Sequence, residues 1–285
     1  MKFISKDILD VDDFLNLNGI NKPPDSYKHL KVVYDNKDIL KSSYINYIFF
    51  ARKYRVVDIP RNSIVKKIGK HSFVEHYNNP KGFSSFIDKF RGDNRSGFCY
   101  MCGALSAGTL DHLLPKDEYP EFSFFSKNLI PSCDCNQKKK ENISSGLNPH
   151  FYEECDEELY YLDISLNGVI NNQISYDFEI KVKKNFNSNF YGLIEYHLNN
   201  HILKFSDIDN YMRNRCASML NNPIDALSIR KKISKNQLRE KIEDFYCAAK
   251  HEAKSSNRWD VIFYKSLLKR SVFLFIFGEI QKKYP

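Results

Sequence analysis

Four cysteines in two close pairs are the residues of this chain whose type and spacing most directly indicate chemistry. Cys99 and Cys102 form the first pair, and Cys133 and Cys135 form the second, with a polar segment between them. Two pairs of thiolates brought together by turns are what a tetrahedral zinc ion requires. We therefore predict a structural zinc site, against the simpler alternative of four buried thiols that bind no metal.

The short spacing of the second pair leaves the ligand set open. Two intervening residues are usual, and the single residue between Cys133 and Cys135 restricts how both sulfurs approach one ion. One of the four ligands could therefore be replaced by His150, Asp134 or Cys155.

An acid and a histidine stand side by side between the cysteine pairs. The Asp111 carboxylate can hold a hard cation, and the His112 imidazole, with a pKa near 6.5, can take a proton from water at neutral pH. Alone the dipeptide indicates little, because a histidine among leucines is more often a core residue whose nitrogens are hydrogen-bonded.

The longer run around this dipeptide resembles the HNH nucleases of the ββα-metal fold. In that family the first strand ends at the motif histidine, an asparagine ends the loop before the second strand, and the last metal ligand begins the helix. The zinc-stapled subgroup has cysteine pairs at the same two places. The resemblance covers about residues 96 to 150, and the matching positions are Asp111, His112, Pro115, Lys116, Tyr119, Pro120, Glu121, Phe122, Asn128, Leu129, Ile130, Pro131, Cys133, Cys135, Asn136, Lys138 and Lys139.

The resemblance implies a role for each matched residue of the site. His112 would be the general base that activates water, and Asp111 would coordinate a catalytic divalent ion, Mg²⁺ or Mn²⁺. Asn128 would hold the loop and orient the histidine, and Asn136 would be the second protein ligand of that ion. Such an ion would neutralise the phosphate and stabilise the leaving oxygen.

Four lysines near the motif are candidates for phosphate contacts, although lysine-rich turns are more often plain solvated surface. They are Lys116, Lys138, Lys139 and Lys140.

The remaining histidines and cysteines have simpler interpretations. His150 could bind a metal or a phosphate, but a structural role is favoured. His197 and His201 are four residues apart and would share a helix face. We expect these two side chains to pack in the core or to contact DNA. The other thiols are expected to be ordinary buried ones, and they are Cys155, Cys216 and Cys247.

The elements around the motif can be read from periodicity and capping residues. Helical spacing predicts helices over residues 37–54, from Pro60 to near Gly69, and over 257–283. Alternation predicts strands over 160–166 and 174–182, with Asn167-Gly168 as the turn. The spacings of Ser206 with Asp209 and of Ser234 with Gln237 fit capping boxes at two helix starts.

These elements predict an α+β chain in three regions. Residues 1–95 would be an N-terminal helical region, 96–155 the ββα-metal nuclease module, and 156–285 a β-hairpin followed by helices.

Composition sets the broad class. The chain has 285 residues and a net charge of +8, which favours polyanionic partners such as nucleic acid, or anionic membrane surfaces. The longest apolar run, residues 272–277, is far shorter than the ~20 residues that span a bilayer, and the N-terminus has no export signal. Paired cysteines without an export signal indicate a reducing compartment, so a cytoplasmic location without membrane contact is expected.

Three functions fit the sequence. The first is an endonuclease that hydrolyses DNA, and the second is an RNA-cleaving enzyme (acting on tRNA, for example), because the same chemistry hydrolyses either backbone. The third is a zinc-dependent module that binds nucleic acid or a partner without turnover. The presence of Asp111, His112, Asn128 and Asn136 together favours an enzyme.

The arrangement of the whole chain also resembles the nuclease subunits of bacterial anti-phage systems, of which the Septu type pairs a nuclease with an ATPase. That resemblance implies that the flanking helices dock an ATPase or another defence-system subunit. Their simpler role is to scaffold the module.

Overall fold

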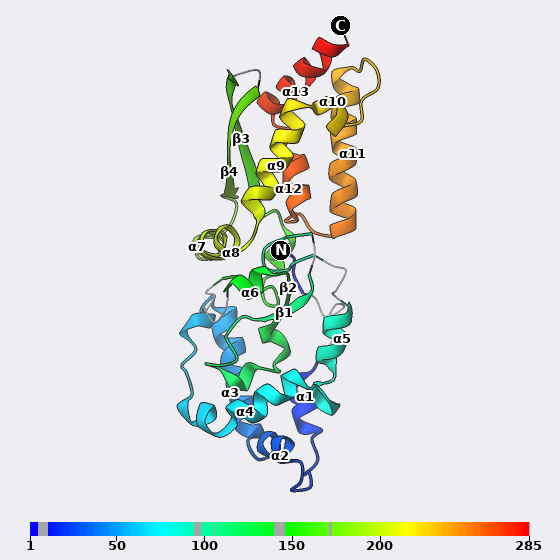
Figure 1. Ribbon diagram of the computed structural model, residues 1–285. Coiled ribbons are helices and arrows are strands. Elements are labelled where there is room, and N and C mark those ends of the chain that lie inside the picture. The colour runs from blue at the N-terminus through cyan, green and yellow to red at the C-terminus, as the bar shows by residue number, and fades with distance from the viewer. Residues whose placement is uncertain (5–10, 94–97, 106, 140–145, 171–172, 285) are drawn as a thin grey trace.

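The chain folds as an elongated α+β molecule with two halves, which confirms the predicted class (Figure 1). The computed structural model describes residues 1–4, 11–93, 98–105, 107–139, 146–170 and 173–284. One half contains the N-terminal helices around a small sheet. The other contains a long β-hairpin and the C-terminal helices. The N-terminus lies where the two halves meet, and the C-terminus lies at the far end of the second half (Figure 1).

Five helices form the outer part of the first half. The predicted helix over residues 37–54 is confirmed as α3, but the helix expected to end near Gly69 continues to Asn78. A glycine inside a helix costs only about 1 kcal/mol relative to alanine, and packing between α2 and α4 offsets that cost. The helices are α1 (Asp13–Asn18), α2 (Lys28–Asp35), α3 (Lys37–Arg52), α4 (Ser63–Asn78) and α5 (Phe86–Asp93), with 3₁₀ turns at Val56–Asp58 and Gly82–Ser84.

A strand–strand–helix unit lies at the centre of the molecule. Strands β1 (Thr109–His112) and β2 (Leu129–Ser132) pair antiparallel, with His112 opposite Leu129, and α6 (Cys135–Lys139) follows. The loop between the strands contains 3₁₀ turns at Pro120–Phe122 and Ser126–Asn128. This is the order of elements that the resemblance to the ββα-metal fold implied.

The β-hairpin is confirmed, but its turn is not where the sequence predicted it. Strands β3 (Tyr160–Ile170) and β4 (Gln173–Val182) pair antiparallel, and Asn167-Gly168 lies inside β3. The register shifts between Leu166 and Gly168, and Gly168 has a φ of 111°. The dipeptide therefore forms a bulge, which also uses the freedom of glycine at positive φ.

Helices pack beside the hairpin in the second half (Figure 1). The capping box of Ser234 and Gln237 is confirmed. That of Ser206 is wrong, because its hydroxyl donates to Ile202 O instead. The last helix is two helices with a break at residues 267–269. The elements are α7 (Ser188–His197), a π-helical turn (Leu198–Ile202), α8 (Leu203–Phe205), α9 (Ile208–Asn221), α10 (Pro223–Ala226), α11 (Lys235–Ala253), α12 (Trp259–Ser266) and α13 (Arg270–Lys283), preceded by a 3₁₀ turn at Glu153–Asp156.

One hydrophobic core runs through all three predicted regions, so the boundaries at 95 and 155 stay a prediction. Aromatic side chains of α3 pack on the loop between β1 and β2, where Tyr44 stacks on Phe125 at 4.1 Å. The Tyr47 hydroxyl donates to Asn128 Oδ1 at 3.2 Å. The N-terminal helices therefore hold the loop that follows the motif histidine.

Among the described residues, no helix combines the length and apolar character that crossing a lipid bilayer requires.

Candidate functional site: a four-cysteine ββα module

The four paired cysteines converge on one point. Their sulfur atoms all lie within 4.8 Å of one another, with 3.7 Å between the sulfurs of Cys99 and Cys135 and 3.5 Å between those of Cys102 and Cys133. Zinc–sulfur bonds of about 2.3 Å in a tetrahedron place the sulfurs just under 4 Å apart. All four thiols are buried and form no disulfide, so the site fits a structural metal such as zinc.

The alternative ligands considered from the sequence do not join this cluster. Asp134 pairs with Lys138 at the surface at 3.3 Å. His150 Nε2 donates to Leu129 O at 2.9 Å, and the Cys155 sulfur contacts the Met1 sulfur at 3.8 Å. The Cys-x-Cys pair thus supplies two sulfurs, because α6 begins at Cys135 and turns this residue back toward the first pair.

The C-terminal half holds the first cysteine turn in place. Gly103 adopts a φ of +80°, and a Cβ there would lie 2.3 Å from Asn257 O. Trp259 Nε1 donates to Cys102 O at 2.6 Å, and His197 Nε2 donates to Met101 O at 2.7 Å. The four-cysteine cluster therefore joins the two halves of the molecule.

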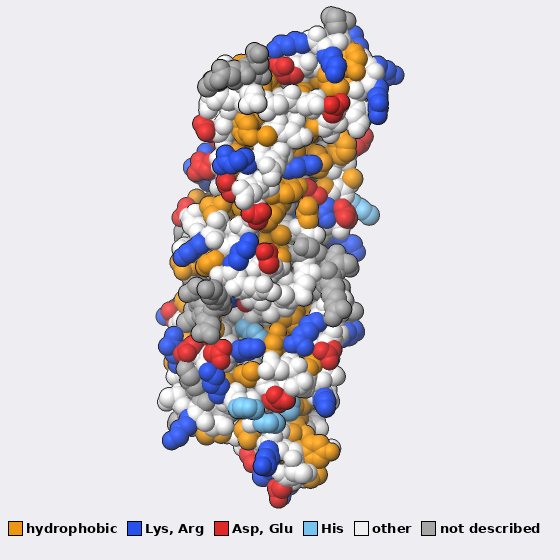
Figure 2. Space-filling model, viewed as in Figure 1, with side chains coloured by type: hydrophobic (Ala, Val, Ile, Leu, Met, Phe, Trp, Pro, Cys, Tyr) orange, Lys and Arg blue, Asp and Glu red, His pale blue; other side chains and the backbone are white. Residues whose placement is uncertain are grey.

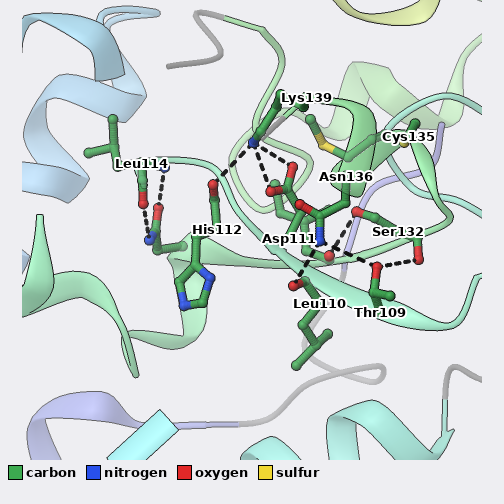
Figure 3. Close-up of polar contacts among 12 residues, drawn as sticks. Thr109, Leu110, Asp111, His112, Leu114, Ser132, Cys135, Asn136 and Lys139 are labelled. Carbon is green, nitrogen blue, oxygen red and sulfur yellow. Dashed lines mark hydrogen bonds and ion pairs between the residues drawn. The ribbon is translucent and has the colours of Figure 1, made fainter. Parts of the chain in front are cut away.

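Asp111 forms a buried ion pair with Lys139. The Lys139 ammonium lies 2.7 Å from each carboxylate oxygen and 3.1 Å from His112 O, and both side chains are 2% exposed (Figure 3). Burial raises the pKa of Asp111, and the charge of Lys139 counteracts this effect. Removing either partner would leave a buried charge, at a cost of roughly 3–5 kcal/mol.

His112 projects from β1 away from Asp111, as successive strand residues do (Figure 3). Its Nε2 lies 2.9 Å from Ser123 O. A carbonyl oxygen can only accept, so Nε2 carries the proton and Nδ1 presents a lone pair. Burial lowers the pKa of His112 to about 3. The bond to Ser123 opposes this effect, and the charges of Lys116, Lys139 and Arg91 add to it.

An aromatic ring lies against His112, and two cations lie over that ring. The Tyr77 ring on α4 contacts the imidazole edge-on, with 4.3 Å between ring centroids. The Arg91 guanidinium lies 4.5 Å from the centre of the Tyr77 ring, and the Lys116 ammonium lies 4.8 Å from the centre of that ring. We call His112, Tyr77, Arg91 and Lys116 the histidine–cation cluster. Arg91 also pairs with Asp88 at 3.2 Å and donates to Tyr77 O at 3.0 Å. With Lys116 included, the cluster has one more positive than negative charge, which favours an anion beside it.

The sequence indicated only part of this cluster. Tyr77 and Arg91 lie on α4 and α5, before the segment that resembles the HNH family, and no spacing in the sequence connects them with His112. Ser123, whose carbonyl fixes the imidazole, contributes through its backbone, which side-chain patterns do not report.

The two motif asparagines fix the local backbone. Asn128 is fully buried: its Oδ1 accepts from Leu114 N at 2.8 Å, and its Nδ2 donates to Leu114 O and Phe122 O. It therefore holds the loop as the resemblance implied, but its hydrogen bonds do not reach the His112 ring. Asn136 Nδ2 lies 3.3 Å from Leu110 O, which fastens α6 to β1.

The predicted phosphate lysines have different environments. Lys116 is half-buried in the histidine–cation cluster, whereas Lys139 is inside the protein in its ion pair and does not line a surface path. Lys138 is exposed beside Asp134, and Lys140 lies outside the described residues. Over the face in Figure 2, Lys and Arg are interspersed with Asp and Glu rather than gathered in one patch.

The remaining histidines and cysteines are mostly structural. His197 and His201 are buried and stack at 4.9 Å, as their shared helix face predicted. Cys155 and Cys216 are buried as expected. The expectation is wrong for Cys247, which is exposed on α11.

The observed arrangement does not fit a divalent ion held by Asp111 and Asn136. Both Asp111 oxygens bind Lys139, and the Asn136 amide is turned toward β1 by its hydrogen bonds. Within the described ranges, the four cysteines are the one group of three or more His, Cys, Asp or Glu residues whose ligand atoms converge. Among these residues, Asp111 belongs to no such group.

A short segment of the chain is similar to a phage protein. Protein ea31 of Escherichia phage lambda is 45% identical over 47 residues, which are 16% of this chain and 16% of the phage protein. The chain thus matches about a sixth of the length of this relative. No protein-family model and no solved structure matches the chain. The argument for function is therefore based on the geometry of the site.

Proposed function

We propose that the protein is an HNH-type nuclease that hydrolyses phosphodiester bonds of DNA, with His112 as the general base. The observation that carries this proposal is the fixed imidazole: Nε2 donates to Ser123 O, and the Tyr77 ring that contacts the imidazole carries two cations. The strand–strand–helix order around the four cysteines supports the same class.

The histidine–cation cluster supplies the groups that hydrolysis needs. Nδ1 of His112 takes a proton from water, the water oxygen forms a bond to phosphorus, and the bond to the 3′ oxygen breaks. The leaving oxygen takes a proton from solvent. Arg91 and Lys116 would bind the phosphate and stabilise the charge that develops on its oxygens.

Phosphate binding also makes His112 a better base. A pKa of about 3 is far below the working pH, so the free imidazole binds a proton weakly. A phosphate beside Arg91 and Lys116 offsets their charge and favours the protonated imidazole. The base would therefore strengthen when substrate is in place.

The test is cleavage of plasmid DNA and of RNA by the zinc-loaded protein, with and without added Mg²⁺ or Mn²⁺. We expect His112→Ala to reduce the DNA cleavage rate by roughly 10²- to 10⁴-fold. His251→Ala is the matched control, because His251 is exposed on α11 in the other half. Equal rates for His112→Ala and wild type would reject His112 as the base. Cleavage of RNA alone would favour the RNA enzyme, and binding without cleavage the non-catalytic module.

A further inference from the structure

We infer that the Lys139 ammonium takes the place of a divalent metal ion at Asp111, so that this carboxylate binds Lys139 and excludes Mg²⁺ or Mn²⁺. The positive group sits between the two carboxylate oxygens, 2.7 Å from each. A third oxygen, His112 O, lies 3.1 Å away. Three oxygens around one positive charge satisfy the three donors of an ammonium group.

The helix geometry makes this pairing a built feature of the module. Asn136 and Lys139 are three residues apart on α6, so both face β1. Asn136 binds Leu110 O and Lys139 binds Asp111, which places α6 across the strand by two polar contacts (Figure 3). The ammonium is therefore held where it is by the helix that begins at the metal ligand Cys135.

Charge balance explains the exclusion. Asp111 and Lys139 together are neutral, and both side chains are 2% exposed. A divalent ion at Asp111 would bring two more positive charges close to the ammonium in a region that water does not screen. Hard cations need anionic oxygen ligands, and the carboxylate here is already neutralised.

The consequence for catalysis rests on the proposed function. If His112 is the base, the cations on the substrate are Arg91 and Lys116, and DNA cleavage does not depend on Mg²⁺ or Mn²⁺. The Asp111–Lys139 pair then positions the strand end that presents His112, because Lys139 also binds His112 O.

The experiment is a titration of the zinc-loaded protein with Mn²⁺, followed by electron paramagnetic resonance of the free ion. We expect wild type to bind no more Mn²⁺ than the double variant Asp111→Asn/Lys139→Met, in which the ion pair is replaced by neutral groups of similar size. Lys139→Met alone should bind one Mn²⁺ at least about tenfold more tightly than wild type does, since this substitution frees the Asp111 carboxylate. Lys139→Arg keeps the positive charge and should behave as wild type.

Two results would overturn the inference. One is a Mn²⁺ ion bound by wild type and lost in the double variant. The other is a folded Lys139→Met protein, with its zinc retained, that gains no Mn²⁺ site. If Lys139→Met does not fold, the comparison of Mn²⁺ binding between wild type and the double variant still tests the inference. Thiolates prefer zinc to Mn²⁺, so added Mn²⁺ should not displace zinc from the cysteines. An unchanged zinc content then shows that the bound Mn²⁺ is not at the cysteine site. Absence of DNA cleavage would reject the proposed function and leave the Mn²⁺ result standing.

Discussion

At the scale of single residues, the site combines side chains that the sequence marked with others that it did not. Asp111, His112, Asn128 and Asn136 are all at the positions that the family pattern implied. Their partners come from elsewhere, and these partners change the chemistry. Lys139 was expected at the surface but neutralises Asp111, because a long side chain on α6 can reach the strand that the helix packs on.

The histidine–cation cluster gives a prediction for nucleic-acid binding. Arg91→Ala and Lys116→Ala should each weaken binding of a short DNA duplex and lower the slope of log affinity against log salt by about one unit, because each removes one phosphate contact. Lys282→Ala is the control, since Lys282 is exposed on α13 in the other half of the molecule. A fluorescence anisotropy titration at several salt concentrations measures both quantities. A slope equal to that of wild type in both variants would remove Arg91 and Lys116 from the binding site.

A buried histidine outside the cluster gives a prediction for pH. Burial lowers the pKa of His150 to about 3, and the charge of Lys127 adds to this effect. The unfolded chain binds this proton near pH 6.5 and the folded protein does not, so stability falls as the pH falls from about 6.5 toward 3. Between about pH 5.5 and 4, wild type should lose roughly 1.4 kcal/mol per pH unit relative to His150→Gln.

Urea unfolding of both proteins with zinc present measures this difference, in which the other titrating groups cancel. His251→Gln serves as the control, since His251 is exposed on α11 in the other half. A stability difference between wild type and His150→Gln that stays constant with pH would mean that His150 is protonated equally in both states.

At the scale of elements, periodicity and capping predicted most helices and the two strands of the hairpin. The position of the hairpin turn and the end of α4 differed from the prediction. The alternation in residues 160–182 gave both strands, but the glycine thought to make the turn makes a bulge, since either feature uses a positive φ. Gly69 did not end α4, because contacts with α2 compensate for a weak helix former. Such contacts join segments far apart in sequence and leave no local pattern.

One glycine controls the first cysteine turn. Gly103→Ala should lower the free energy of unfolding by roughly 1–3 kcal/mol from backbone strain at a φ of +80°, with a further loss because the added Cβ would lie 2.3 Å from Asn257 O. Gly108→Ala is a suitable control, since a Cβ there meets no atom within 4 Å. Urea unfolding of the zinc-loaded variants measures both effects. Equal stability of the two variants would contradict this account of the turn.

At the scale of the whole molecule, the four-cysteine cluster is where the two halves meet. Trp259 of α12 and His197 of α7 both donate hydrogen bonds to the backbone of the first cysteine turn. The sequence predicted the cluster but not its neighbours, because His197 and Trp259 lie 96 and 157 residues along the chain from the residues whose carbonyls they bind. The site is thus supported by both halves.

Loss of the metal should therefore destabilise both halves of the molecule and not the module alone. We expect Cys133→Ser to lower the zinc content and to lower the unfolding temperature of the whole chain in one transition. Cys247→Ser should change neither, because that thiol is exposed. Metal analysis and calorimetry measure the two quantities. A full zinc equivalent in Cys133→Ser would reject the ligand set.

The proposal that His112 is the base is tested most directly by restoring the missing group. In single-turnover cleavage of plasmid DNA by zinc-loaded His112→Gly, we predict a rate roughly 10²- to 10⁴-fold below wild type that rises when imidazole is added. The added imidazole would supply the lone pair that Nδ1 presents in wild type. A His112→Gly protein that cleaves at the wild-type rate without imidazole would contradict the account.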